Sequence, residues 1–132
     1  MIHVLDTNTV AYFFRGEGRV ADRFLATLRS QIAIPSIVAY ELRYGAERVP
    51  DAKRLAEQLN TLFTWVTILP FDASAAQVAA KIRVELERAG QPIGPHDVLI
   101  AATSLAVNGT IVTRNITEFG RVKGLRVENW YD

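Results

Sequence analysis

The sequence predicts an α/β fold in which an open, mainly parallel sheet of about five strands carries helices on both faces. Short runs that are apolar at successive positions, rather than at alternate ones, are typical of strands covered on both sides. Segments with apolar residues at helical spacing separate these runs, and such alternation implies right-handed crossovers between parallel strands. The predicted strands are residues 2–5, 32–34, 66–69, 110–113 and 125–127.

Four helices are predicted between the first three strands. The first covers 8–15, and the second covers 19–28, where apolar residues recur on one face. Ser36 follows the second strand and is expected to cap a helix that runs to about residue 49. Asp51 is expected to cap the next helix, which leads into the third strand.

Two longer helices are predicted in the second half of the chain. One covers 74–89 and has Gly90 as its C-cap. Pro95 suits the first turn of the other, which ends near Asn108. The length of 132 residues is that of one ordinary domain, and no linker or repeat interrupts the pattern, so a single domain over 1–132 is expected.

The composition excludes several kinds of chemistry. The chain has no Cys, which excludes disulfides, a thiol nucleophile and a thiolate zinc site, and its two His argue against a His-rich metal site. No apolar run approaches 18 residues, so we expect a soluble, cytoplasmic protein without membrane contact. Serine-hydrolase and phosphate-loop motifs are absent. Catalysis, if present, must depend on carboxylates.

Four acidic residues are expected at one end of the sheet, where open α/β sheets bind ligands. Asp6 ends the first strand, and Glu41 lies about one turn into the helix after the second. Asp97 sits in the first turn of the helix before the fourth strand, and Glu118 follows that strand. Clustered carboxylates repel one another unless a cation neutralises them. Mg²⁺ or Mn²⁺ would do so, because both prefer hard oxygen ligands.

Three of these acids also have a purely structural explanation. Asp6 could cap the helix after the first strand. Asp97 could complement a helix dipole, and Glu118 could be a solvated loop residue. The sequence leaves both explanations open.

Glu41 is harder to explain by structure alone. Its neighbours, including Tyr40 and Tyr44, indicate a helix with much of its surface covered, and an acid there needs a partner. His96 precedes Asp97 and is expected to be a first-turn histidine beside the site rather than a general base.

Four blocks of sequence occur in order along the chain: VLDTN, PSIVAYELRYGA, GQPIGPHDVLIAA and IVTRNITEFGRVKGLRVENW. Together they resemble the PIN-domain ribonucleases, specifically the VapC-type toxins of toxin–antitoxin pairs. No single block suffices, because DTN alone is frequent by chance, but the four in this order and spacing extend the resemblance over essentially the whole chain.

The resemblance implies site residues and a cofactor. The implied metal-binding and catalytic acids are Asp6, Glu41, Asp97 and Glu118. Supporting polar residues are implied at Asn8, Thr113 and Asn115. The implied cofactor is one or two Mg²⁺ or Mn²⁺ ions. Many relatives have Asp where this chain has Glu118, so the chain departs from the family pattern at that position.

The resemblance also implies an activity and partners. The activity is metal-dependent endoribonuclease cleavage of single-stranded or loop RNA, in which water attacks a phosphodiester and leaves a 5′-phosphate and a 3′-hydroxyl. Relatives cut tRNA, rRNA or mRNA. A cognate antitoxin is implied, whose C-terminal segment lies in a groove between early helices, as is a homodimer. The stretch 10–14 and the helix at 51–63 are candidates for that groove.

The charge balance is compatible with a nucleic-acid partner. If the four acids are sequestered around metal, 15 basic and ten acidic residues remain, a difference of +5. Twelve of the basic residues are Arg, the better bidentate partner for phosphate, although a GC-rich genome would also favour Arg. Candidate phosphate contacts near the site edge are Arg15, Arg43, Arg114 and Arg121.

Two other functions are alternatives to the nuclease. A catalytically degenerate PIN-like RNA-binding module would keep the fold and lose the chemistry, but all four acidic positions are filled. A phosphoryl-accepting receiver domain needs an acidic pair at the first strand, and Asp6 has no acidic neighbour. The nuclease is therefore the favoured prediction.

Overall fold

The computed structural model describes all 132 residues and contains one sheet of five strands, in which every pair of neighbours is parallel. The strands are β1 (His3–Leu5), β2 (Ile32–Pro35), β3 (Thr67–Leu69), β4 (Thr110–Val112) and β5 (Arg126–Glu128). Their order across the sheet is β3-β2-β1-β4-β5. The predicted fold class is confirmed.

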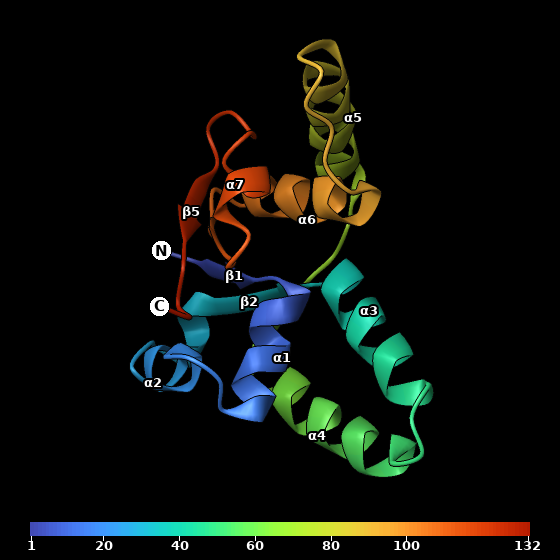
Figure 1. Ribbon diagram of the computed structural model, residues 1–132, viewed down its shortest axis with the longest axis vertical. Helices are drawn as coiled ribbons and strands as arrows, with labels where there is room; N and C mark the ends of the chain where they lie inside the picture. The colour runs from blue at the N-terminus through green and yellow to red at the C-terminus, as the bar shows by residue number, and fades with distance from the viewer.

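Seven α-helices and one short 3₁₀ turn connect the strands. They are α1 (Thr7–Arg15), α2 (Val20–Leu25), α3 (Ser36–Glu47), α4 (Ala52–Trp65), α5 (Ala73–Arg88), α6 (Pro95–Ala106), α7 (Ile116–Phe119) and the turn η1 (Arg29–Gln31). Figure 1 shows α1 to α4 on one side of the sheet and α5 to α7 on the other. None of the helices is long and apolar enough to cross a lipid bilayer.

The strands are apolar at successive positions because helices cover both faces of the sheet. Val4, Ile34 and Ile111 lie in the middle of three adjacent strands and are fully buried. Burying such a side chain contributes roughly 1.5–3 kcal/mol relative to leaving it exposed. The packed sheet therefore holds the residues that follow each strand in fixed positions.

The chain reverses its direction of travel across the sheet at β1. The connections from β1 through β2 to β3 move toward one edge, and β4 and β5 are then added on the other side of β1. Such a switch point leaves a crevice at the carboxyl ends of the two strands that flank it. The residues directly after β1 and β4 line this crevice.

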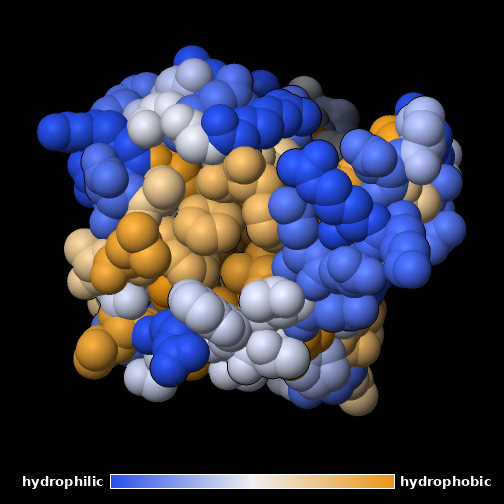
Figure 2. Space-filling model, turned by 90° about the horizontal axis from the view of Figure 1, so that it is seen from below, coloured by the Kyte–Doolittle hydropathy of each residue, from blue (hydrophilic) through white to orange (hydrophobic).

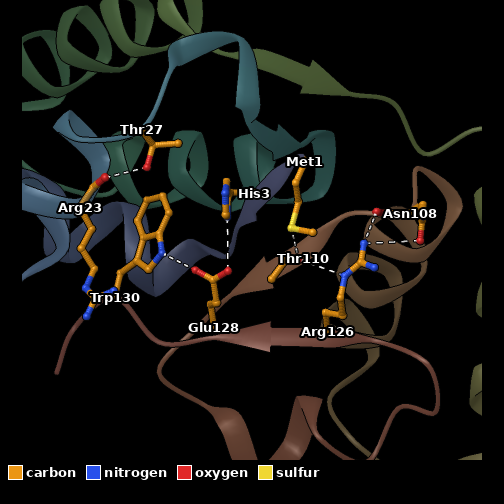
Figure 3. Close-up of polar contacts among 9 residues, drawn as sticks. All are labelled: Met1, His3, Arg23, Thr27, Asn108, Thr110, Arg126, Glu128 and Trp130. Atoms are coloured by element: carbon orange, nitrogen blue, oxygen red, sulfur yellow. Dashed lines mark hydrogen bonds and ion pairs between the residues drawn. The ribbon is translucent and has the colours of Figure 1, made fainter.

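Polar contacts fasten the edge strand β5 to the rest of the sheet (Figure 3). Arg126 Nη2 donates to the Asn108 carbonyl oxygen at 2.6 Å. Glu128 accepts a hydrogen bond from Trp130 Nε1 at 3.0 Å, and its other carboxylate oxygen lies 3.7 Å from His3 Nδ1. The two end residues of β5 are thereby linked to the residues before β4 and to β1.

The second helix is shorter than the sequence predicts. It ends at Leu25, and residues 29–31 form the η1 turn in place of a continued helix. Leu25 and Leu28, which helical spacing assigned to a buried face, are 71% and 66% exposed. Their exposure places apolar side chains on the surface at the end of α2 and just after it.

The predicted cap at Ser36 is wrong, because Ser36 is already the first residue of α3 and Pro35 occupies the N-cap position. Asp51 does occupy the N-cap position of α4, although its side chain makes no capping hydrogen bond. Asp72 caps α5, with Oδ1 accepting from the Ala75 amide at 2.9 Å. The helix α7 was not predicted, since four residues are too short to show a helical period.

Candidate active site

The structure brings the four predicted acids to the crevice at the switch point. Asp6 directly follows β1, and Asp97 lies in the first turn of α6. Glu41 projects from α3 and Glu118 from α7, which follows β4. Asp6, Glu41 and Glu118 all repel the Asp97 carboxylate electrostatically. Four elements from distant parts of the sequence therefore contribute one acid each.

Asp6 is both a helix cap and a buried acid. Its Oδ1 accepts a hydrogen bond from the Thr9 amide at 2.9 Å, which confirms that it caps α1. Only 6% of the residue is exposed, and this burial raises the pKa of Asp6 above its usual value. Hydrogen bonds from Thr113 and Thr9 act in the opposite direction, while the charge of Glu41 adds to the increase. The hydrogen bonds therefore only partly offset the cost of burying the Asp6 charge beside the crevice.

Asp97 carries the clearest electrostatic signature of the site. Partial burial, followed by repulsion from Glu118, Asp6 and Glu41, raises the pKa of Asp97 to about 6, and only His96 acts in the opposite direction. The N-cap residue of α6 is Gly94, and no side chain caps this helix. Asp97 is therefore not a helix cap, although its place in the first turn still complements the helix dipole.

The pKa of Asp97 predicts how the stability of the metal-free protein depends on pH. The folded-state pKa of about 6 lies above the ordinary value of 3.8, so between these values the folded chain binds more protons than the unfolded chain. The free energy of unfolding should therefore decrease as the pH rises from about 4 to about 6. In Asp97→Asn this decrease should be smaller. Thermal melts of both proteins across this pH range, in the presence of a chelator, measure the difference. If stability falls equally with pH in wild type and Asp97→Asn, the prediction is contradicted.

Glu41 has two polar partners from distant parts of the chain. Its Oε1 accepts a hydrogen bond from Thr7 Oγ1 at 2.6 Å, and its Oε2 lies 3.2 Å from His96 Nδ1. The resemblance implies a supporting role for Asn8 and none for Thr7. Asn8 is exposed on α1 and its side chain makes no hydrogen bond. The only signal for Thr7 was a hydroxyl next to Asp6 in the DTN block.

Thr7→Val tests whether the Thr7 hydroxyl positions Glu41. Mutating a residue that orients a metal ligand typically lowers metal affinity or activity by about 10–100-fold. We therefore expect the rate of RNA cleavage and the affinity for Mn²⁺ to fall about tenfold. Cleavage rates and calorimetric titration with Mn²⁺ measure both. Thr27→Val is the matched control, since Thr27 Oγ1 bonds only the Arg23 carbonyl oxygen on α2. Equal losses in the two variants would refute a positioning role.

Thr113 and Asn115 lie beside the fourth acid, as predicted. Glu118 Oε2 accepts a hydrogen bond from Asn115 Nδ2 at 2.8 Å. The Asn115 amide in turn donates to Thr113 Oγ1 at 2.9 Å, and Thr113 is buried at the end of β4. This chain of contacts ties Glu118 to the sheet, so it is not a freely solvated loop residue.

The chemistry of the donor set fits a hard divalent cation. All four acids offer carboxylate oxygens, and burial and mutual repulsion disfavour the charged forms of Asp6 and Asp97, a cost that a cation would relieve. In the present side-chain positions, however, no three His, Asp or Glu residues are arranged to hold one ion. Glu41 and Glu118 face protein donors instead. Ligation by three acids would require one of these side chains to turn.

Two of the four candidate arginines point away from the site. Arg15 lies at the far end of α1, about 14 Å along the helix from Asp6, and its Nη1 is 3.5 Å from Glu17. Arg43 donates from Nη2 to Asn60 Oδ1 at 2.7 Å, which links α3 to α4. A role for either in binding RNA at the carboxylates is not supported by these positions.

The other two arginines lie in the segments next to Glu118. Arg114 follows Thr113 directly, and its guanidinium carbon is 3.6 Å from the centroid of the Tyr131 ring. Arg121 donates from Nη1 to the Pro92 carbonyl oxygen at 3.2 Å. Contact of these two with phosphate stays a prediction.

Comparison with known proteins identifies the family. The family model described as "PIN domain" matches residues 3–125. "Ribonuclease VapC2" of Rickettsia felis is 36% identical over 98% of each chain, and the "tRNA(fMet)-specific endonuclease VapC" of Shigella flexneri is 36% identical over 96% of each. The crystal structure of DNA-bound VapBC from Salmonella typhimurium superposes with a TM-score of 0.92 at 34% identity, covering 98% of both chains.

A parallel sheet with acids gathered at its switch point, together with these matches, defines the class of protein. The chain belongs to the PIN-domain family, and within it to the VapC-type ribonucleases. The resemblance predicted from the sequence is confirmed.

Proposed function

We propose that this protein is a Mg²⁺- or Mn²⁺-dependent endoribonuclease that acts as the toxin of a toxin–antitoxin pair. The observation that carries this proposal is the convergence of four carboxylates, two of them with raised pKa values, in a chain whose relatives are named ribonucleases. The relative from Shigella flexneri is named for tRNA(fMet), which makes tRNA the first substrate to test, with rRNA and mRNA after it.

Each group of residues has a separate task in this proposal. Asp6 and Asp97 would hold one divalent ion, with Glu41 and Glu118 turning toward it. The ion would supply positive charge at the scissile phosphate and lower the pKa of water. Thr7 and His96 keep Glu41 near the crevice, and Asn115 keeps Glu118 there.

Incubation of the full chain with total cellular RNA tests the proposal. With Mg²⁺ we expect defined cuts, and sequencing of the ends should give 5′-phosphates and 3′-hydroxyls. EDTA should abolish the cuts. Cuts that resist EDTA, or that end in cyclic phosphates, would overturn the proposed chemistry. RNA that is bound but never cut would favour the degenerate RNA-binding module instead.

An apolar hollow supports an antitoxin as partner. It measures about 270 Å³, lies between α1, α2 and α4, and is lined by Phe13, Phe14, Phe24, Gln58, Thr61, Leu62 and Trp65. Figure 2 shows an apolar area at the centre and left of this face of the molecule, bordered above and on the right by hydrophilic residues. The exposed Leu25 and Leu28 extend from α2 beyond the hollow. An apolar antitoxin segment would cover this area. The lining includes residues of the stretches 10–14 and 51–63, the two candidates for the antitoxin groove. A homodimer stays a prediction.

Trp65→Ala should weaken the complex with the cognate antitoxin about tenfold or more. Trp65 is half-exposed in the lining of the hollow, and Trp is one of the residue types whose truncation most often removes much of the binding free energy of an interface. Titration calorimetry with the co-encoded antitoxin measures the change. Val84→Ala, which trims exposed apolar surface on α5, should alter the affinity by less than about twofold. Equal affinities for wild type and Trp65→Ala would place the antitoxin elsewhere.

A further inference from the structure

Two exposed tyrosines lie side by side on α3, close to the carboxylates. Tyr40 is 58% exposed and Tyr44 is 55% exposed. Their ring centroids are 6.5 Å apart and their planes differ by 22°, so the two rings are nearly parallel. The prediction that this part of the helix is covered is wrong. We call Tyr40 and Tyr44 the tyrosine pair.

The tyrosine pair is continuous with the candidate active site at one end. Tyr40 precedes Glu41 in the chain, and the edge of its ring meets His96, with ring centroids 6.0 Å apart. His96 in turn lies 3.2 Å from the Glu41 carboxylate. A strand of RNA whose phosphate reaches the carboxylates therefore passes next to Tyr40.

A cation lies at the other end of the pair. The Arg48 guanidinium carbon is 5.2 Å from the centroid of the Tyr44 ring, and Arg48 is exposed at the end of α3. The acidic site, the two tyrosine rings and the Arg48 guanidinium therefore follow one another along one side of α3. This order matches a nucleic-acid strand, in which bases and negatively charged phosphates alternate.

The surroundings of the pair distinguish it from the apolar hollow. Both tyrosine hydroxyls lack hydrogen-bond partners within the chain, and the exposed neighbours along this side include Glu47 and Arg48. An apolar peptide would leave these charges uncompensated, whereas the faces of bases tolerate a wet, charged border. Aromatic side chains in such settings stack on unpaired bases with little sequence preference.

From this geometry we propose that Tyr40 and Tyr44 form a stacking subsite for unpaired bases of RNA next to the scissile phosphate. The inference rests on the proposed ribonuclease function and adds to it a subsite that holds bases of the single-stranded or loop RNA expected as substrate. Arg48 contacts the phosphate beyond the second stacked base. Bases within a duplex are already stacked and cannot use the subsite.

The subsite can be tested by binding a short single-stranded RNA that carries 2-aminopurine, a base whose fluorescence is quenched by stacking. Every protein in this assay carries Asp97→Asn so that the RNA stays intact. Adding Tyr40→Ala or Tyr44→Ala should each weaken binding roughly tenfold and reduce the quenching. Tyr40→Phe and Tyr44→Phe keep the ring and should stay within about twofold, as should the surface control Val84→Ala. Duplex RNA should bind all variants equally.

Binding and quenching that are unchanged in both alanine variants would overturn the inference. Cleavage by the chain with Asp97 intact separates this outcome from failure of the proposed function. If the tyrosine pair forms the subsite, the alanine variants raise KM and keep kcat. If the chain cuts RNA and the variants change neither constant, the nuclease stands and the subsite is refuted. A chain that cuts no RNA refutes the nuclease. Alanine variants that shift the sedimentation of the protein while RNA affinity is unchanged would identify the pair as a contact between copies, which also refutes the inference.

Discussion

Replacing Asp97 by Asn is expected to lower the rate of RNA cleavage at least about 100-fold and to relieve growth arrest when the chain is expressed without antitoxin. Losing a residue that only orients a ligand costs about 10–100-fold, so losing a ligand itself should cost more. The change removes a charge at the carboxylate that the other three acids most affect. Cleavage of purified RNA and growth at matched expression levels measure the two effects.

Asp72→Asn is the matched control for this substitution. Asp72 caps α5 through Oδ1, and Asn caps a helix about as well as Asp, so cleavage and growth arrest should both persist. Equal toxicity of wild type and Asp97→Asn at equal expression would count against a nuclease that uses Asp97.

Saturating Mn²⁺ is expected to raise the melting temperature of the wild-type chain by about 10 °C. A ligand at one hundred times its dissociation constant, bound only by the folded state, adds roughly 2.7 kcal/mol, and the unfolding entropy of a domain of this size converts that free energy into a Tm shift of about 10 °C. Asp97→Asn should respond far less, because one of the four proposed ligands is missing. Differential scanning calorimetry with and without Mn²⁺ measures both shifts.

The metal-free proteins give an independent comparison. Near neutral pH the ionised Asp97 faces three other carboxylates, so metal-free Asp97→Asn should melt at least as high as metal-free wild type. Loss of a cap is no objection, because Asp97 does not cap α6. If metal-free Asp97→Asn melts well below wild type, and Mn²⁺ shifts both equally, Asp97 serves the helix dipole and the four-acid metal site is wrong.

The positions of the four acids could be predicted because strands are readable from short apolar runs. A run such as IHVL marks a buried strand, and the residue after it must emerge at the carboxyl edge of a parallel sheet. That rule places Asp6 without knowledge of any contact. The four-residue α7 carries no periodic signal, so the position of Glu118 depended on the strand before it.

The contacts made by Glu41 could not be predicted in the same way. Thr7 and His96 are separated from Glu41 by 34 and 55 residues, and they meet it only because the starts of α1 and α6 converge on α3. The exposure of Tyr40 and Tyr44 has a similar origin. Aromatic residues predict burial on average, but whether another helix covers that side of α3 depends on how distant elements pack.

The central position of β1 constrains the order in which the molecule can assemble during synthesis. His3 pairs with Ile32 on one side and with Thr110, 107 residues later in the chain, on the other. β1, β2 and β3 can associate early, but pairings between such distant residues form late because the intervening loop must first be closed. Asp6 and Glu41 belong to the early part, and Asp97 and Glu118 belong to the late one. A growing chain therefore cannot bring the four carboxylates together until the ribosome has made nearly all of it.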